Sequence, residues 1–224
     1  MAAAVVLAGQ MLLRAHSLLL CKGVASTPTC PLSSGCQEPL SALFDRAIHL
    51  STSLHSLSSE LLEKFEIKFS KGPKYFIPDI NGCHTDAITI PGIHEEVTEI
   101  RYKDFIILAS CFMRSWKEPM ELFITGVKQL PNVQSDILSK AVAIKDQNHE
   151  LLDVLEKIAS QVNPEIKDNG MYVVWIEPEH DMPVSSVPRM RSFYNRIRCL
   201  RRDTNKLDRF FKYLKCNIIE SAKC

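Results

Sequence analysis

Basic side chains crowd one segment near the C-terminus, from Val187 to Lys215. Ten lysines and arginines and two aspartates occur there, a net charge of +8, although the whole chain carries only +1. Guanidinium and ammonium groups at this density bind carboxylates and aromatic rings through charge-assisted hydrogen bonds and cation–π contacts. The segment is therefore predicted to bind an acidic partner, with heparin-like polyanions as one class. The plainer alternative is a solvated basic face.

Cysteines form the second group of reactive side chains, eight in all. Cys21 belongs to a stretch that we expect to be removed, and seven remain. No pair has the CxxC spacing of a structural zinc site, so three disulfides with one thiol left over are expected. Spacing favours Cys30 with Cys36 and Cys216 with Cys224, although the sequence alone permits many pairings. The seven are Cys30, Cys36, Cys83, Cys111, Cys199, Cys216 and Cys224.

Signatures of catalysis are missing from the sequence. It shows no identifiable Ser/His/Asp or Cys/His arrangement, no glycine-rich phosphate loop and no HExxH metal motif. An enzyme is therefore not expected, and neither a cofactor nor a metal site is predicted. These observations favour a protein that acts by binding.

The first 26 residues have the character of a secretory leader. They are apolar but interrupted at Gln10 and Arg14, which makes them too short for a membrane span. Val24 and Ser26 form a small-x-small cleavage site before Thr27. We therefore expect residues 1–26 to be a signal peptide and residues 27–224 to be one secreted, extracellular four-helix domain. Neither membrane insertion nor nucleic-acid binding is predicted.

Four stretches repeat apolar residues at alternating spacings of three and four, which is the period of a helix. The clearest stripe runs through the basic segment, so that helix should have one apolar and one cationic face. Its positions are Met190, Phe193, Ile197, Leu200, Thr204, Leu207, Phe211 and Leu214. Pro119 should kink the second helix, and Ser135 is the candidate N-cap of the third. The predicted helices are Pro39–Phe69, Glu99–Val127, Ser135–Val162 and Met190–Leu214.

Loop lengths predict how these helices are connected. Residues 71–98 and 163–187 form long connections, whereas residues 129–134 form a short one. A short link joins antiparallel neighbours and a long one can return to the starting end, so an all-α, up-up-down-down four-helix bundle is predicted. Cys83 lies near the middle of the first long loop. Pairing it with Cys199 would close a loop of 116 residues, worth roughly 4 to 5 kcal/mol in the chain-entropy model.

Six strings spread along the chain carry a family resemblance. They are CQEPLSALFDRAIHLS, LSSELLEKFEIKF, NGCHT, RSWKEP, ILSKAV and CLRRDTNKLDRFFKYLKC. These strings resemble the prolactin family of hormones, which includes the placental paralogues of prolactin. The resemblance implies a long-chain helical cytokine with the bridges Cys30–Cys36, Cys83–Cys199 and Cys216–Cys224. It also implies a secreted hormone that binds the ectodomain of a cytokine-class, prolactin-type receptor and signals by receptor dimerisation.

The resemblance further implies two receptor-binding faces. The first face, on the first and fourth helices and the first long loop, captures one receptor chain. The second face, on the first and third helices, recruits another. The matching residues are Ile48, His55, Tyr194, Arg198, Arg202 and Lys206 on the first face and Val154 on the second.

Two departures from the family pattern predict a diverged paralogue. The histidine cluster of the first face keeps only His55, with Thr52, Asn205 and Arg198 at the other positions, so metal binding there is not expected. Val154 replaces a glycine that lets the second receptor chain approach. Because Val154 lies beside the apolar stripe of its helix, we expect it to face outward, to obstruct that receptor by its volume and to weaken agonism.

Other interpretations stay open at this point. The alternative function is binding to heparin, matrix or a different receptor, with weak or no prolactin-receptor agonism. A small molecule or metal in the bundle core is disfavoured, because the stripes carry no Glu-x-x-His ligands. Cys111 is either a buried inert thiol or a bridge to a second molecule. Trp116, Trp175 and Asn148 are predicted core residues, the asparagine with its hydrogen bonds satisfied.

Overall fold

A computed structural model of the chain describes residues 37–69, 82–88, 102–130, 135–166, 170–176 and 181–220. The compact unit from Glu38 onward contains all of the helices. The predicted leader, with Cys21, Val24, Ser26 and Thr27, lies outside the described residues, so it stays a prediction. The elements are α1 (Leu40–Phe69), the 3-10 helix η1 (His84–Ala87), α2 (Tyr102–Ser115), α3 (Lys117–Lys128), α4 (Ser135–Val162), α5 (Val187–Lys215) and the short π-helical turn η2 (Cys216–Glu220).

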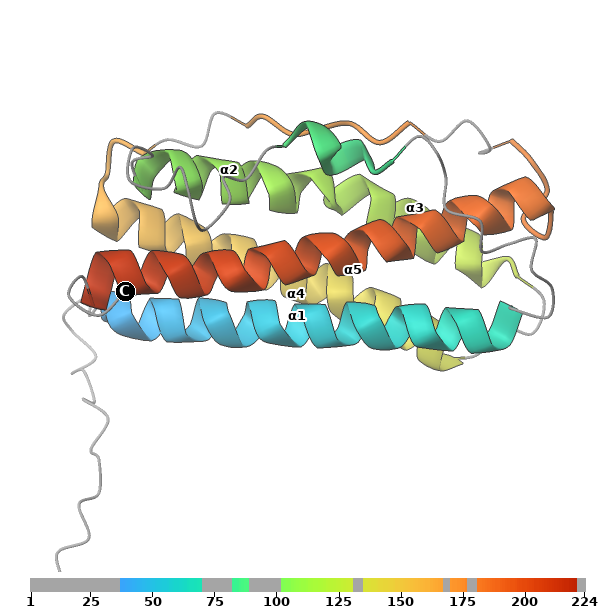
Figure 1. Ribbon diagram of the computed structural model, residues 1–224, viewed down its shortest axis with the longest axis horizontal. Coiled ribbons are helices and arrows are strands. Elements are labelled where there is room, and N and C mark those ends of the chain that lie inside the picture. The colour runs from blue at the N-terminus through green and yellow to red at the C-terminus, as the bar shows by residue number, and fades with distance from the viewer. Residues whose placement is uncertain are drawn as a thin grey trace, which may run out of the picture. The chain divides into compact units, whose positions relative to one another are not determined.

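The helices pack as a bundle in which α1 and α5 lie side by side (Figure 1). Helix α4 packs behind them, against α1 and against the α2–α3 pair. Following the colours of Figure 1, α1 and α2–α3 run in one direction and α4 and α5 run in the other. Hydrogen bonds confirm that α1 and α5 are antiparallel, because Thr52 bonds Asp208 and His55 bonds Thr204. Among the described helices, none combines the length and apolar character that crossing a membrane requires.

The apolar stripe of α5 is confirmed, because all eight of its predicted positions are buried. Thr204 is its one polar member, and its hydroxyl lies 2.7 Å from the hydroxyl of Ser58 on α1. The helix begins at Val187, three residues before the predicted start at Met190. The reason is local, since the side chain of Ser186 accepts a hydrogen bond from the Arg189 amide and caps the first turn.

The second predicted helix is two helices, because the chain breaks at Trp116 between α2 and α3. Pro119 was expected to cause only a kink. A proline has no amide proton for the carbonyl four residues earlier, and its ring crowds that carbonyl. The carbonyl concerned belongs to Ser115, and it accepts instead from His84 Nε2 at 2.9 Å. The break therefore gives the first long connection a docking point on the bundle.

The long connection between α1 and α2 was predicted to lack regular structure, yet it contains η1. Immediately before η1, Cys83 is bonded to Cys199 of α5, with their Cα atoms 5.7 Å apart. This predicted bridge is confirmed. Cys30, Cys36 and Cys224 lie outside the described residues, so the other two pairings stay predictions.

Three predicted core residues differ in how deeply they are buried. Trp116 is 2% exposed, and Asn148 donates a hydrogen bond to the Met113 carbonyl at 2.9 Å, as expected of a satisfied polar group. Trp175 is only half-buried.

Cys111 is a half-buried thiol packed against the core. This position fits an inert thiol of the fold more closely than a bridge to a second molecule.

Candidate functional site

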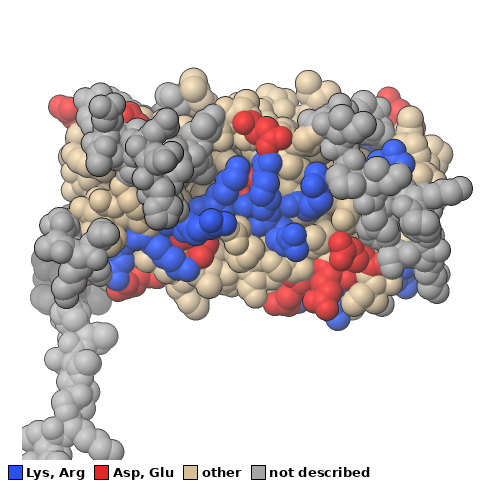
Figure 2. Space-filling view, viewed as in Figure 1, with Lys and Arg blue, Asp and Glu red and all other residues tan. Residues whose placement is uncertain are grey.

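Lysine and arginine side chains form a band along α5 on the face shown in Figure 2, with acidic side chains above its middle and below its right end. The band is less uniform than the sequence indicates. Arg196 is fully buried and Arg189 is 5% exposed. The guanidinium of Arg196 stacks 4.8 Å above the ring of Trp175, so it packs within the fold and is not available to a partner.

Three other cations of α5 are already paired with acids. Arg202 bonds Asp86 and Asp203, Lys212 bonds Asp208, and Lys215 bonds Asp45. By contrast, four cations have no acid within ion-pair distance among the described residues. These four are Arg198, Arg201, Lys206 and Arg209.

A shallow groove of about 410 Å³ lies where three of these four cations, Arg201, Lys206 and Arg209, approach α1. We call it the α1–α5 groove, and its lining residues are His55, Ser59, Arg201, Arg202, Asn205, Lys206 and Arg209. It brings together three of the predicted receptor residues, namely His55, Arg202 and Lys206. Arg198 lies one turn earlier on α5 and is half-buried.

His55 is fixed in the groove by two neighbours on α5. Its Nε2 lies 3.1 Å from the Asn205 amide nitrogen and its Nδ1 lies 3.4 Å from the Thr204 hydroxyl. Because an amide nitrogen can only donate, Nε2 is the acceptor of the first of these hydrogen bonds. Thr52 of α1 donates a hydrogen bond to Asp208 of α5 at 2.6 Å. These side chains therefore join α1 to α5.

The remaining two predicted residues of the first face lie at its opposite ends. Ile48 is half-buried against the core. Tyr194 is 9% exposed, and burial followed by the nearby carboxylate of Glu66, to which it is hydrogen-bonded, raises the pKa of its hydroxyl. Since α1 and α5 are antiparallel, these ends are about 27 Å apart along the helices, from the rise of 1.5 Å per residue. The predicted face is a long strip, and its middle is the groove.

Asp203 is the most connected residue that the sequence did not single out. It is fully buried and accepts hydrogen bonds from the Thr85 hydroxyl, from Trp116 Nε1 at 3.1 Å and from Arg202 Nε at 2.8 Å. One carboxylate thus joins η1, the α2–α3 break and α5. The sequence contains one indication of this role. Asp203 lies three residues after Leu200, so the helical period places an acidic side chain on the apolar face of a basic helix.

Asp86 holds Arg202 from the other side. The backbone amide of Cys83 donates to its carboxylate at 2.7 Å. Burial alone would raise the pKa of Asp86, but this amide and the Arg202 guanidinium outweigh burial and lower it. Gly82, at φ 72°, leaves the space that this carboxylate occupies. Arg202 therefore holds α5 against the segment beside the disulfide. Because its guanidinium is already paired with Asp86 and Asp203, fewer of its donors remain for a binding partner.

His84 completes this junction as a structural histidine. Its ring meets Trp116 and Trp175 edge-on, with centroids 4.8 and 5.0 Å away. Burial between these rings lowers the pKa of His84, although its hydrogen bond to the Ser115 carbonyl acts in the opposite direction. The neutral ring therefore donates from Nε2 to that carbonyl.

The expectation that Val154 faces outward is wrong, because its side chain is fully buried. Helix α4 packs against α1 on one side and against α2–α3 on the other. It consequently buries a wider face than a single stripe, with Leu151, Val154, Leu155 and Ile158 all in the core. Val154 cannot obstruct a receptor by direct contact.

Replacing Val154 with glycine is expected to lower the free energy of unfolding by about 2 kcal/mol, from the cavity and the flexible backbone together. Urea denaturation measures this change. Lys157→Gly is the matched control, since Lys157 is exposed one turn later on α4 and carries the backbone effect alone. Equal losses for the two variants would contradict the buried position of Val154.

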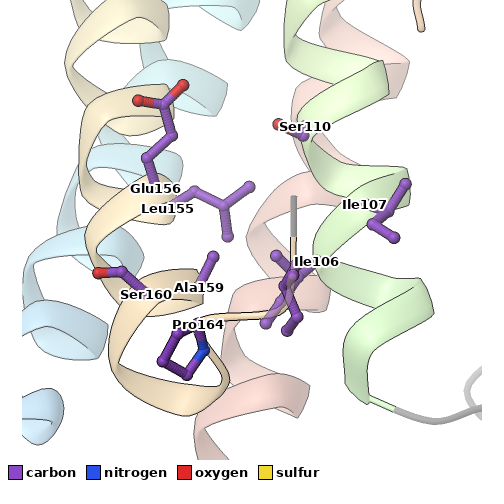
Figure 3. A pocket seen from close by; sticks show the side chains of 9 residues that line it. Ile106, Ile107, Ser110, Leu155, Glu156, Ala159, Ser160 and Pro164 are labelled. Carbon is purple, nitrogen blue, oxygen red and sulfur yellow. The ribbon is translucent and has the colours of Figure 1, made fainter. Parts of the chain in front are cut away.

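A separate hollow of about 240 Å³ opens between α2 and α4. Figure 3 shows its wall of Ile106, Leu155, Ala159 and Pro164, with the Glu156 carboxylate pointing away from them. Across the described ranges, no three His, Cys, Asp or Glu side chains gather closely enough to hold a metal. The hollow is mainly apolar, and its polar lining residues are Ser110, Glu156 and Ser160.

The family of the chain follows from its sequence and agrees with this geometry. Residues 13–224 match the sequence model of the somatotropin hormone family. The match covers nearly the whole chain, including all of the helices and both cysteines of the Cys83–Cys199 bridge. The chain belongs to the somatotropin hormone family, whose members are hormones and not enzymes.

Proposed function

We propose that this protein is a secreted hormone of the prolactin branch that captures a cytokine-class receptor ectodomain with the α1–α5 face. The observation that carries the proposal is that Lys206 lies with His55 in the α1–α5 groove and Arg198 lies about two turns earlier on the same helix. Among the described residues, neither cation has an acid within ion-pair distance. Cations left unpaired at a surface gain most from a partner that supplies carboxylates or aromatic faces.

Two further features support the assignment. The Cys83–Cys199 bridge is of the kind that persists in oxidising compartments such as the secretory pathway. The directions of the helices in Figure 1 are those of an up-up-down-down bundle, the topology that we propose, together with three disulfides and a cleaved leader over residues 1–26.

Signalling requires a second receptor chain, which we propose is recruited by the exposed surfaces of α1 and α4. The buried position of Val154 removes the reason to expect a stalled ligand. The competing possibility is a diverged hormone with a different receptor. Binding to a panel of cytokine-class receptor ectodomains separates the two, and the prolactin-type ectodomain is expected to bind.

The double change Arg198→Glu with Lys206→Glu should weaken capture of that ectodomain by about 100-fold, since central charged contacts at interfaces carry much of the affinity. Arg202 is left intact because it clamps the fold through Asp86 and Asp203. Surface plasmon resonance with the immobilised ectodomain measures the effect.

The control is Lys117→Glu with Lys157→Glu, an equal change of charge at exposed positions on α3 and α4, which should leave capture within twofold of wild type. Unchanged capture by the Arg198/Lys206 variant would place the first face elsewhere. No binding by wild type to a prolactin-type ectodomain would overturn the prolactin-branch assignment.

A further inference from the structure

We propose that the α1–α5 groove is also a binding site for a sulfated polysaccharide chain of the heparin class. The groove is defined by Arg201, Lys206 and Arg209 on α5 and by His55 and Ser59 on α1. Arg201 and Arg209 are exposed, and neither belongs to the receptor residues proposed above. The site therefore extends beyond the receptor face while sharing part of it.

The cations of this site form a row. Arg198, Arg201, Lys206 and Arg209 follow each other at spacings of three to five residues, which keeps them on one side of α5. The row is about 16 Å long, from the helical rise of 1.5 Å per residue. Figure 2 shows the corresponding band of cationic side chains along α5. A row of this kind matches a linear polyanion better than a single small anion.

The charge of the row is available to a ligand. The four cations lack an acid within ion-pair distance among the residues that the structure describes. Arg209 is held by the Asn205 side-chain oxygen, with Nε donating at 2.9 Å. That oxygen is uncharged, so it orients the guanidinium without neutralising it. The guanidinium is thus placed in advance, which lowers the entropy cost of binding an anion.

The lining of the groove favours a sulfated sugar over other polyanions. Its other polar groups, on His55, Ser59 and Asn205, suit the hydroxyls and sulfates of a glycan. The groove has no Phe, Tyr or Trp ring of the kind on which nucleic-acid bases usually stack. It also has no apolar side chain to enter a lipid interface. The disulfide Cys83–Cys199 indicates an extracellular setting, where sulfated polysaccharides are the common linear polyanions.

One consequence rests on the function proposed above. His55 and Lys206 belong both to the groove and to the receptor face, so a bound glycan and a bound receptor would occupy the same surface. The full protein is therefore expected to bind one of them at a time. Matrix-bound hormone would be held inactive until the glycan dissociates.

The test is affinity for a heparin oligosaccharide, measured by surface plasmon resonance at rising NaCl concentrations. The double change Arg201→Glu with Arg209→Glu should weaken binding by about thirtyfold, at roughly tenfold per 1.4 kcal/mol and about 1 kcal/mol per cation near an anionic surface. Lys117→Glu with Lys157→Glu, which changes the net charge equally, should stay within twofold of wild type. Equal losses in both variants would mean unspecific charge attraction and would overturn the site.

Competition tests the shared surface on the wild-type protein. Saturating heparin oligosaccharide should prevent capture by the receptor ectodomain, and chemically desulfated heparin should not. Simultaneous binding of heparin and receptor would overturn the proposal that they share one surface. Binding to phosphatidylserine vesicles but not to heparin would overturn the proposal that the ligand is a glycan. Heparin affinity is measured without any receptor, so its loss leaves the proposed hormone function standing, and absent receptor binding leaves the glycan site standing.

Discussion

Replacing Cys83 and Cys199 together with serine is expected to lower the free energy of unfolding by roughly 4 to 5 kcal/mol, by the chain-entropy model of a disulfide. The bridge spans 116 residues, so its loss frees a large part of the unfolded chain. Both cysteines are buried, at 7% and 1% exposure, and two serine hydroxyls there would add a desolvation cost. The reduction is large relative to the 5 to 15 kcal/mol that stabilises an ordinary domain.

Guanidinium denaturation of the purified protein measures this loss. Cys111→Ser is the control, because Cys111 is a half-buried thiol of α2 outside the bridge. It should lower the free energy of unfolding by much less than the double change. A loss below about 1 kcal/mol in the Cys83/Cys199 variant would contradict the chain-entropy account.

Asp203→Ala should lower the free energy of unfolding by about 3 to 5 kcal/mol, from about 1 to 3 kcal/mol for each of two buried donors that lose their acceptor. The substitution leaves the Thr85 hydroxyl and the Trp116 indole N–H buried without their acceptor. It also removes one of the two carboxylates that hold Arg202. The free energy of unfolding from urea titration gives the size of the effect.

A double-mutant cycle with Thr85→Val separates the network from a simple cavity. Alone, Thr85→Val should cost about 1 kcal/mol, the value of a typical hydrogen bond. In the Asp203→Ala background it should cost almost nothing, because the orphaned hydroxyl is then removed as well. Strict additivity of the two changes would show that Asp203 and Thr85 are not energetically coupled.

The helices could be predicted from the sequence because periodicity reports burial directly. Each apolar position of the α5 stripe, from Met190 to Leu214, is buried. The start of that helix could not be placed as well. It depends on one capping hydrogen bond, which the Arg189 amide donates to the Ser186 side chain, and no position of the apolar stripe marks it.

Features that depend on several neighbours escaped the sequence. The position of Val154 could not be predicted, because a stripe gives one line on a helix and α4 is covered on two sides. Asp203 and His84 acquire their roles from partners more than 30 residues away in the chain. Among the six predicted residues of the first face, pairing with Asp86 and Asp203 sets Arg202 apart from Arg198 and Lys206. Those two have no acid within ion-pair distance in the part of the chain that the structure describes.

The Cys83–Cys199 bridge also decides how the protein responds to proteolysis. Together with the backbone, it makes a closed covalent circle that includes α2, α3, α4 and the first half of α5. A single peptide-bond cleavage inside the circle leaves both fragments linked until the disulfide is reduced. Helix α1 lies outside the circle and is connected to it through residues 70–82 alone. One cleavage there would leave α1, which forms one wall of the groove, attached by packing only.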